Sequence, residues 1–158
     1  MRILFLYLLF LFAVFPAKAQ TIKPFGAAIY VDDLERASEW YQDIFDVTST
    51  NKISYPELNN LNIEILNNEY LQFELVERDN SFSIYELEPD YNIREKPLRG
   101  FYKLAFQVED IEYLYEQIQA KQVEIHFELT TDSEFGIKTF IIRDPGNNLL
   151  QFIEIISK

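Results

Sequence analysis

Two stretches of the sequence decide the fold because they begin alike: GAAIYVDDLE at residues 26–35 and KLAFQVEDIE at residues 103–112. A constant offset of 77 residues superposes them without a gap, with Ala28 on Ala105 and Asp33 on Asp110. Further along, the same offset superposes two polar turns and, after them, two apolar runs. The same order of apolar pattern, turn and apolar pattern in both stretches indicates an internal duplication, whose two copies stack as one domain.

The pattern of apolar residues in each copy predicts a strand, a helix and three further strands. Residues 25–31 alternate and are rich in β-forming side chains, whereas the apolar residues after Asp33 recur at helical spacing. This spacing predicts helices over 33–45 and 111–121, each with an aspartate N-cap. The remaining strands are expected at 47–54, 61–66 and 70–77 in the first copy, and at 123–129, 137–143 and 148–155 in the second.

Length and composition favour one globular domain. The chain has 158 residues, of which 48% are apolar, enough for one buried core and too few for two domains of ordinary size. The absence of cysteine excludes disulfides and thiolate metal sites, and the single histidine, His126, excludes any site that needs two imidazoles. The net charge of −12 argues against a nucleic-acid partner, because phosphate contacts need clustered cations.

Residues 1–19 are interpreted as a cleaved signal peptide. Arg2 is followed by thirteen uncharged residues, and an Ala-x-Ala cleavage pattern comes after them at residues 17–19. Thirteen residues are fewer than the ~20 of a bilayer-spanning helix, so no membrane span is expected after cleavage; a buried helix or an uncleaved anchor is the alternative. Cleavage would leave residues 20–158 with a net charge of −14, and the protein is expected to be periplasmic or secreted from a bacterium.

The mature chain is expected to form a single domain from two modules, 24–77 and 100–156, joined by a linker over residues 78–99. The linker is polar, contains two prolines and is expected to run over the surface. Its aromatic residues either cap a cavity or pack against the surface, and the sequence leaves both alternatives open. These residues are Phe82, Tyr85 and Tyr91.

These features resemble the vicinal oxygen chelate superfamily, which includes glyoxalase I, bleomycin-resistance proteins, fosfomycin-resistance enzymes and extradiol dioxygenases. The resemblance rests on the paired modules, on VDDL at residues 31–34 before a helix with Trp40-Tyr41, and on RDPGNNLLQ at residues 143–151. It covers residues 24–156. It implies an α+β fold in which paired βαβββ modules form a curled eight-stranded mixed sheet around a cavity, with both helices on its outer face.

The resemblance also implies four cavity positions, which in metal-dependent members hold a divalent cation that polarises two vicinal oxygens of the substrate. They correspond here to Gly26, Glu74, Lys103 and Gln151, and the offset of 77 relates Gly26 to Lys103 and Glu74 to Gln151. Glycine has no side chain, an ammonium only donates hydrogen bonds, and an amide is a weak ligand. No divalent metal and no other cofactor is therefore expected.

Lys103 is instead predicted to form an ion pair with Glu74 across the two modules, with Gln151 accepting a second hydrogen bond. The alternative is that Lys103 and Glu74 reach solvent separately. If Gly26 faces the cavity, alternation turns Tyr30 inward as well. The full set of predicted ligand-binding residues is Tyr30, Glu74, Phe101, Lys103, Gln107 and Gln151.

The only histidine lies in the run VEIHFEL at residues 123–129, where alternation places Glu124, His126 and Glu128 on one face. Ligands at i, i+2 and i+4 of one strand spread over roughly 13 Å and cannot converge on one ion. We therefore interpret this face as a polar surface of an outer strand.

Three functions are compatible with these residues. The favoured one is a metal-free binding protein similar to the bleomycin-resistance branch, which holds a cationic or aromatic small molecule in its cavity or in the groove of a homodimer. The second is a glyoxalase-like lyase or isomerase, which uses Lys103 as electrophile and Glu74 as base or an unrecognised divalent metal site. The third is a module whose surface binds another exported protein. Glu74 and Lys103 are thus the only candidates for a catalytic role.

Overall fold

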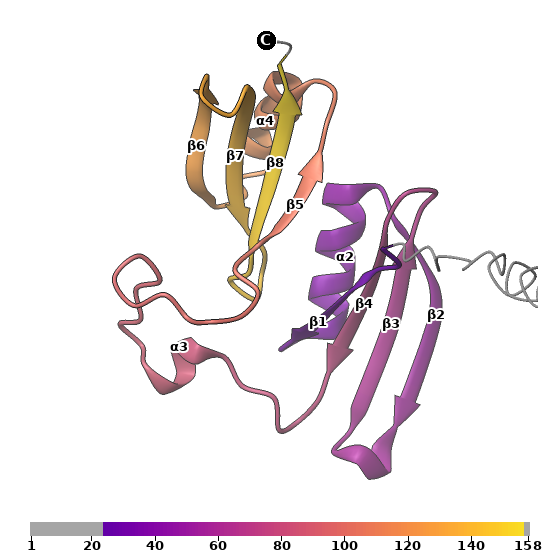
Figure 1. The fold of residues 1–158 in the computed structure, drawn as a ribbon. Coiled ribbons are helices and arrows are strands. Elements are labelled where there is room, and N and C mark those ends of the chain that lie inside the picture. The colour runs from indigo at the N-terminus through magenta and orange to yellow at the C-terminus, as the bar shows by residue number, and fades with distance from the viewer. Residues whose placement is uncertain (1–23, 157–158) are drawn as a thin grey trace, which may run out of the picture.

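The computed structural model describes residues 24–156, and the predicted signal peptide over residues 1–19 lies outside them. Within this range no helix is long and apolar enough to span a membrane. The predicted helices and strands are present, with ends within three residues of the prediction. The elements are β1 (Ala27–Val31), α2 (Leu34–Phe45), β2 (Thr48–Tyr55), the 3-10 turn η1 (Pro56–Leu58), β3 (Leu61–Asn67), β4 (Gln72–Glu77), α3 (Ile84–Leu87), β5 (Leu104–Gln107), α4 (Ile111–Ala120), β6 (Ile125–Asp132), β7 (Ile137–Arg143) and β8 (Leu149–Ile155) (Figure 1).

The eight strands form two four-stranded sheets, which we call sheet A and sheet B. Sheet A has the order β1-β4-β3-β2 and sheet B the order β5-β8-β7-β6. In each sheet the first pair is parallel and the other two pairs are antiparallel. The predicted α+β class with two βαβββ modules is confirmed, with the difference that the strands are divided between two mixed sheets instead of continuing as one.

The internal duplication extends to the strand register. Ala28 of β1 pairs with Glu74 of β4, and Ala105 of β5 pairs with Gln151 of β8. Both members of the second pair follow those of the first by 77 residues, which is the offset that the sequence predicts. The two modules therefore place corresponding residues at corresponding points of their sheets.

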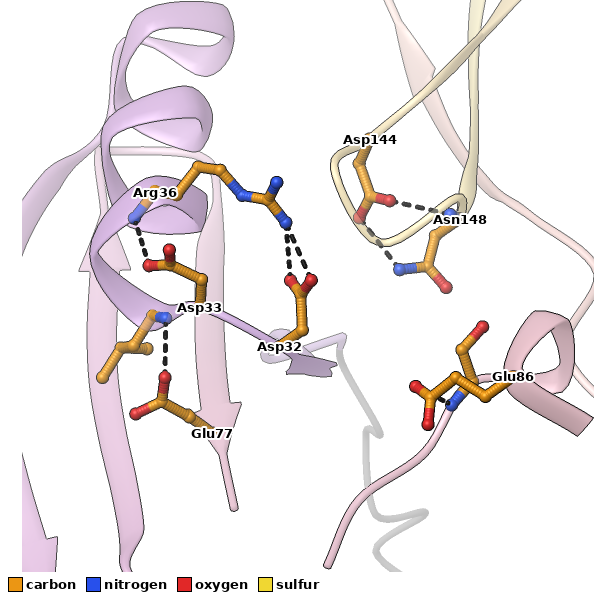
Figure 2. Close-up of polar contacts among 9 residues, drawn as sticks. Asp32, Asp33, Arg36, Glu77, Glu86, Asp144 and Asn148 are labelled. Atoms are coloured by element: carbon orange, nitrogen blue, oxygen red, sulfur yellow. Dashed lines mark hydrogen bonds and ion pairs between the residues drawn. The ribbon is translucent and has the colours of Figure 1, made fainter. Parts of the chain in front are cut away.

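The N-terminus of each long helix receives two carboxylates, which satisfy N–H groups that have no partner within the helix. In α2, Asp33 accepts from the N–H of the third helical residue at 2.9 Å, and Glu77 of β4 accepts from the first at 3.2 Å (Figure 2). In α4, Asp110 and Glu154 accept from the corresponding N–H groups at 3.0 and 2.9 Å. The duplicated sequence thus repeats the chemistry that starts each helix.

Helix α2 lies beside sheet A and near β5 of sheet B (Figure 1), and its aromatic rings contact both sheets. The ring centroid of Phe45 is 5.0 Å from that of Phe73 in sheet A, 4.8 Å from that of Phe106 and 5.9 Å from that of Phe152 in sheet B. Helix α2 therefore covers the outer face of sheet A, as predicted, and also contacts sheet B. Its aromatic side chains bury apolar surface on two sides, and this places the helix at the module interface.

A buried hydrogen bond also joins the modules. The hydroxyl of Tyr41 in α2 donates to Oδ2 of Asp144, in the turn between β7 and β8, at 2.7 Å. Asp144 also accepts from the backbone N–H and the side-chain amide of Asn148 (Figure 2). Burial, together with the charge of Asp144 and the hydrogen bond to it, raises the pKa of Tyr41 far above its ordinary value, so this hydroxyl keeps its proton.

Candidate functional site

Glu74 lies on the face of sheet A that points away from α2. Its neighbours Phe73 and Leu75 belong to the buried core, so the alternation of the strand turns Glu74 to the opposite face. Ala28 pairs with Glu74, and Tyr30 lies two residues further along β1, so both occupy that face. The side chain of Tyr30 is 59% exposed. We call Ala28, Tyr30 and Glu74 the open face of sheet A.

The corresponding face of sheet B carries Ala105, Gln107 and Gln151. Gln151 is buried, and its Nε2 donates to Oγ1 of Thr139 at 2.8 Å. Gln107 is exposed at the end of β5. We call Ala105, Gln107 and Gln151 the open face of sheet B. Its polar groups are amides, one of which is already held by a neighbouring strand.

The two predicted site residues before β5 lie outside the regular strand. Lys103 is half-buried, and its Nζ lies 5.4 Å from the ring centroid of Tyr102, a cation–π contact. Phe101 is fully exposed. These residues therefore enter sheet B at its edge, where they are accessible from solvent.

One copy of the chain does not bring Glu74 and Lys103 together. Within residues 24–156 no ion pair joins them, so the predicted intramolecular ion pair is wrong. The reason is the division of the strands: Glu74 belongs to sheet A, Lys103 leads into sheet B, and α2 packs its aromatic rings between the two sheets. The predicted ligand-binding residues therefore form two separate groups, one on each sheet.

The region around His126 differs from the prediction of a regularly alternating strand. The register of β6 against β7 shifts twice, once on each side of Phe127. As a result, Glu124 and His126 both contact Arg143, whereas Glu128 contacts the hydroxyl of Tyr115 in α4. The interpretation that Glu124, His126 and Glu128 share one face is therefore wrong, because the shifts interrupt the period of two.

A cavity of about 480 Å³ lies between the linker and sheet B, and sequence reasoning did not predict it. The two linker tyrosines Tyr85 and Tyr91, whose role the sequence left open, contribute to its wall. The other lining residues are Pro89, Asp90, Asn92, Ile93, Arg94, Glu124, His126, Arg143 and Asn147. The two hydrogen bonds that join the linker to sheet B at this cavity connect residues 32 and 58 positions apart in the sequence, and no local periodicity reveals such contacts.

With this geometry established, residues 23–152 match the sequence pattern of the Glyoxalase/Bleomycin resistance protein/Dioxygenase superfamily. The chain belongs to this superfamily. Comparison with curated proteins gives no match.

Solved structures of the glyoxalase superfamily share the fold. A glyoxalase family protein from Enterococcus faecalis has a TM-score of 0.70 and 21% identity, over 84% of this chain and 97% of that one. The fosfomycin resistance protein FosX from Listeria monocytogenes has a TM-score of 0.63 and 16% identity, over 84% and 93%. A glyoxalase I variant from Zea mays has a TM-score of 0.62 and 21% identity, over 82% of this chain and 46% of that one. At these identities the likeness establishes the fold alone.

The residues at the four positions that the family resemblance implies, which we call the superfamily positions, do not supply the ligands that a divalent cation needs. A Cβ atom added at Gly26 would lie 2.8 Å from the carbonyl oxygen of Gln72, so backbone packing excludes a larger side chain there. Lys103 offers only donors, and the amide of Gln151 is engaged with Thr139. Glu74 alone supplies a carboxylate, whereas a hard cation needs several oxygen ligands.

Proposed function

We propose that this protein is an exported, metal-free member of the superfamily that binds a small molecule on its open sheet faces, similar to the bleomycin-resistance branch. The observation that carries the proposal is the donor set at the four superfamily positions. One carboxylate, one ammonium, one engaged amide and one glycine can bind an organic molecule by charge and hydrogen bonds, but they cannot complete the coordination of a metal ion.

The exposed groups favour a ligand that is aromatic or cationic. Tyr30 and Phe101 offer exposed aromatic rings, which stack on flat ligands and attract cations. Glu74 adds a negative charge on the open face of sheet A, and the net charge of the whole chain is −12. A cationic aromatic molecule satisfies both features at once.

We propose that the binding groove forms between two copies of the chain. The open face of sheet A carries the carboxylate of Glu74, and the edge of sheet B carries the ammonium of Lys103. Because these opposite charges do not meet within one copy, a two-fold dimer that places sheet A of one copy against sheet B of the other would pair them twice. Light scattering is expected to give the mass of two chains. Reversing the charge of either Glu74 or Lys103 is expected to raise the dissociation constant of the dimer.

Export is proposed from the pattern of residues 1–19 alone. Mass spectrometry of the protein recovered from the periplasm or medium of a bacterial host is expected to give an N-terminus at Gln20, after the Ala-x-Ala pattern. Recovery of the intact chain from the cytoplasm would contradict it.

The central test is thermal unfolding of protein stripped with a chelator and then titrated separately with Ni²⁺, Zn²⁺, Mn²⁺, Fe²⁺ and Mg²⁺. A ligand that binds only the folded state raises the free energy of unfolding by RT ln(1 + [L]/Kd) and thereby raises the unfolding temperature. We expect no saturable shift with any of these ions and a saturable shift with cationic aromatic molecules. Saturable stabilisation by a metal ion would overturn the metal-free assignment.

A glyoxalase-like lyase or isomerase is the second candidate, because Glu74 and Lys103 supply one base and one electrophile of the kind that proton abstraction beside a carbonyl needs. Assays with vicinal-oxygen substrates distinguish the two functions. If the protein is an enzyme of this type, Lys103→Ala abolishes turnover. If it is a binding protein, neither wild type nor variant shows turnover and Lys103→Ala changes ligand affinity only.

A further inference from the structure

The lining of the cavity between the linker and sheet B includes hydrogen-bond donors that are left without an acceptor within residues 24–156. We propose that it is a second binding site, which takes the carboxylate group of a small ring-bearing molecule. Its lining includes none of the residues at the superfamily positions or on the open faces, so it is distinct from the proposed function. The donors belong to Arg94, His126, Arg143 and Tyr85.

Arg143 is held in a fixed orientation at the wall of the cavity. Its side chain is 13% exposed, and its Nε lies 3.1 Å from a carboxylate oxygen of Glu124. Nη1 donates to the hydroxyl of Tyr85 at 3.2 Å and to the carbonyl of Asn147 at 3.1 Å, and Nη2 lies 3.2 Å from Nδ1 of His126. Three of the five guanidinium N–H groups thus make hydrogen bonds, Nε forms an ion pair with Glu124, and one N–H on Nη2 is left for a ligand.

His126 presents a further donor. Because a guanidinium can only donate, its contact with Nδ1 assigns that nitrogen as an acceptor and places the proton of the neutral ring on Nε2. Burial lowers the pKa of His126, and the charges of Arg143 and Arg94 lower it further, whereas Glu124 acts in the opposite direction. The ring is therefore neutral near pH 7, and Nε2 has no partner within residues 24–156.

Arg94 and Tyr85 complete the donor set. Nη2 of Arg94 donates weakly to the carbonyl oxygen of His126 at 3.4 Å, and within residues 24–156 this guanidinium has no carboxylate partner. The hydroxyl of Tyr85 accepts from Arg143, so its own proton is available. Of the two cavity carboxylates, Glu124 is engaged by Arg143 and Asp90 is exposed to solvent.

These donors define the chemistry of the ligand. A fixed Arg143, a neutral His126 and an unpaired Arg94 require a negatively charged group with several acceptor oxygens, which a carboxylate supplies with the planar geometry that guanidinium prefers. The rings of Tyr85 and Tyr91, 5.5 Å apart between centroids and nearly perpendicular, form an aromatic wall beside these donors. A planar ring attached to the carboxylate fits this wall. A phosphate shares the oxyanion chemistry but not the ring.

The sole histidine makes the test direct. In the protein purified without a histidine tag, the imidazole gives one set of ring signals in NMR spectra, and these signals report on the cavity. Benzoate, benzamide and inorganic phosphate are titrated separately. We expect benzoate to shift the His126 signals saturably and to raise the pKa of His126, because a bound anion favours the imidazolium, while benzamide of the same shape has no effect. The charges that act on His126 are those of Arg143, Arg94 and Glu124, and the other titratable groups that line the cavity are Tyr85, Asp90 and Tyr91.

A pair of variants controls for net charge. Arg94 and Arg99 both lie exposed in the linker, but only Arg94 lines the cavity. We expect Arg94→Gln to weaken benzoate binding by about tenfold and Arg99→Gln to leave it unchanged. Equal responses to benzoate and benzamide, equal effects of the two variants, or no saturable response to benzoate would overturn the proposal. Binding of phosphate without benzoate would overturn the assignment to a ring carboxylate.

Discussion

The substitution Tyr41→Phe tests whether the two modules are joined as the structure shows. It removes the hydroxyl that donates to Asp144 at 2.7 Å and keeps the ring that packs against Phe45 and Phe73. The loss is therefore confined to one hydrogen bond between α2 and the turn that links β7 to β8.

The magnitude follows from the surroundings of Asp144. Both partners are buried, with Tyr41 at 0% and Asp144 at 5% exposure, so water does not replace the lost bond freely. A hydrogen bond to a charged group contributes about 1.5–3 kcal/mol. Asp144 keeps two bonds from Asn148, at 2.7 and 2.9 Å, so it is not left without partners. We expect Tyr41→Phe to lower the free energy of unfolding by about 2 kcal/mol.

Urea denaturation followed by circular dichroism measures this change. With a slope of about 2 kcal/mol per molar urea, the midpoint is expected to fall by roughly 1 M while the slope stays constant. Tyr115→Phe is the matched control, because Tyr115 is also a helix tyrosine whose hydroxyl donates to a carboxylate, but its partner Glu128 is exposed. We expect the control to change stability by less than about 0.5 kcal/mol. If both variants lose the same small amount, the Tyr41–Asp144 bond does not hold the modules together and the reasoning is refuted.

Three further predictions concern stability. Burial would raise the pKa of Glu64 on folding, but the nearby hydroxyls of Ser49 and Ser38 and the ion pair with Lys52 outweigh burial, so the pKa is lowered. The ionised carboxylate of Glu64 therefore stabilises the fold at pH values above its ordinary pKa. We expect urea titrations to give Glu64→Gln a lower free energy of unfolding than wild type at pH 7, and the difference in this free energy to narrow as the pH falls through and below about 4.5. Gly26→Ala is expected to lower the free energy of unfolding by about 1–3 kcal/mol, because the Cβ of the alanine would lie 2.8 Å from the carbonyl oxygen of Gln72. An unchanged melting temperature would contradict the close approach of Gly26 to Gln72. Glu77→Gln and Glu154→Gln are each expected to cost about 1 kcal/mol in chemical denaturation, and clearly unequal losses would argue against equivalent helix caps.

The sequence predicts those features that depend on local pattern and on the duplication. Both long helices could be predicted because apolar residues recur at helical spacing after Asp33 and Asp110, and the structure confirms both aspartates as N-caps. The correspondence between the two modules could be predicted because a constant offset carries Ala28 and Glu74 onto Ala105 and Gln151, which pair in the same way. Periodicity and offset are properties of the chain itself, so one sequence is sufficient to find them.

Features that depend on packing between distant segments could not be predicted in this way. The ring of Phe45 packs against both sheets, and the helical spacing in the sequence does not reveal which distant segments the helix contacts. The predicted ion pair between Glu74 and Lys103 assumed that the two sheets continue into each other. The cavity beside Arg143 depends on where the linker docks, and a linker has no period from which to derive its position.

The duplication separates the residues that build the fold from those that distinguish the two modules. The carboxylates that cap the helices repeat in both copies, since each helix needs the same N–H groups satisfied to form. The superfamily positions do not repeat: Gly26 corresponds to Lys103, and Glu74 corresponds to Gln151. Because Glu74 and Lys103 lie on or beside the open faces, these two side chains can differ from their counterparts without disturbing either core, whereas Gly26 is fixed by its close approach to Gln72. The two modules therefore share the contacts that start their helices, while their open faces carry different functional groups. Different functional groups are what the proposed groove would need to bind chemically different parts of one ligand.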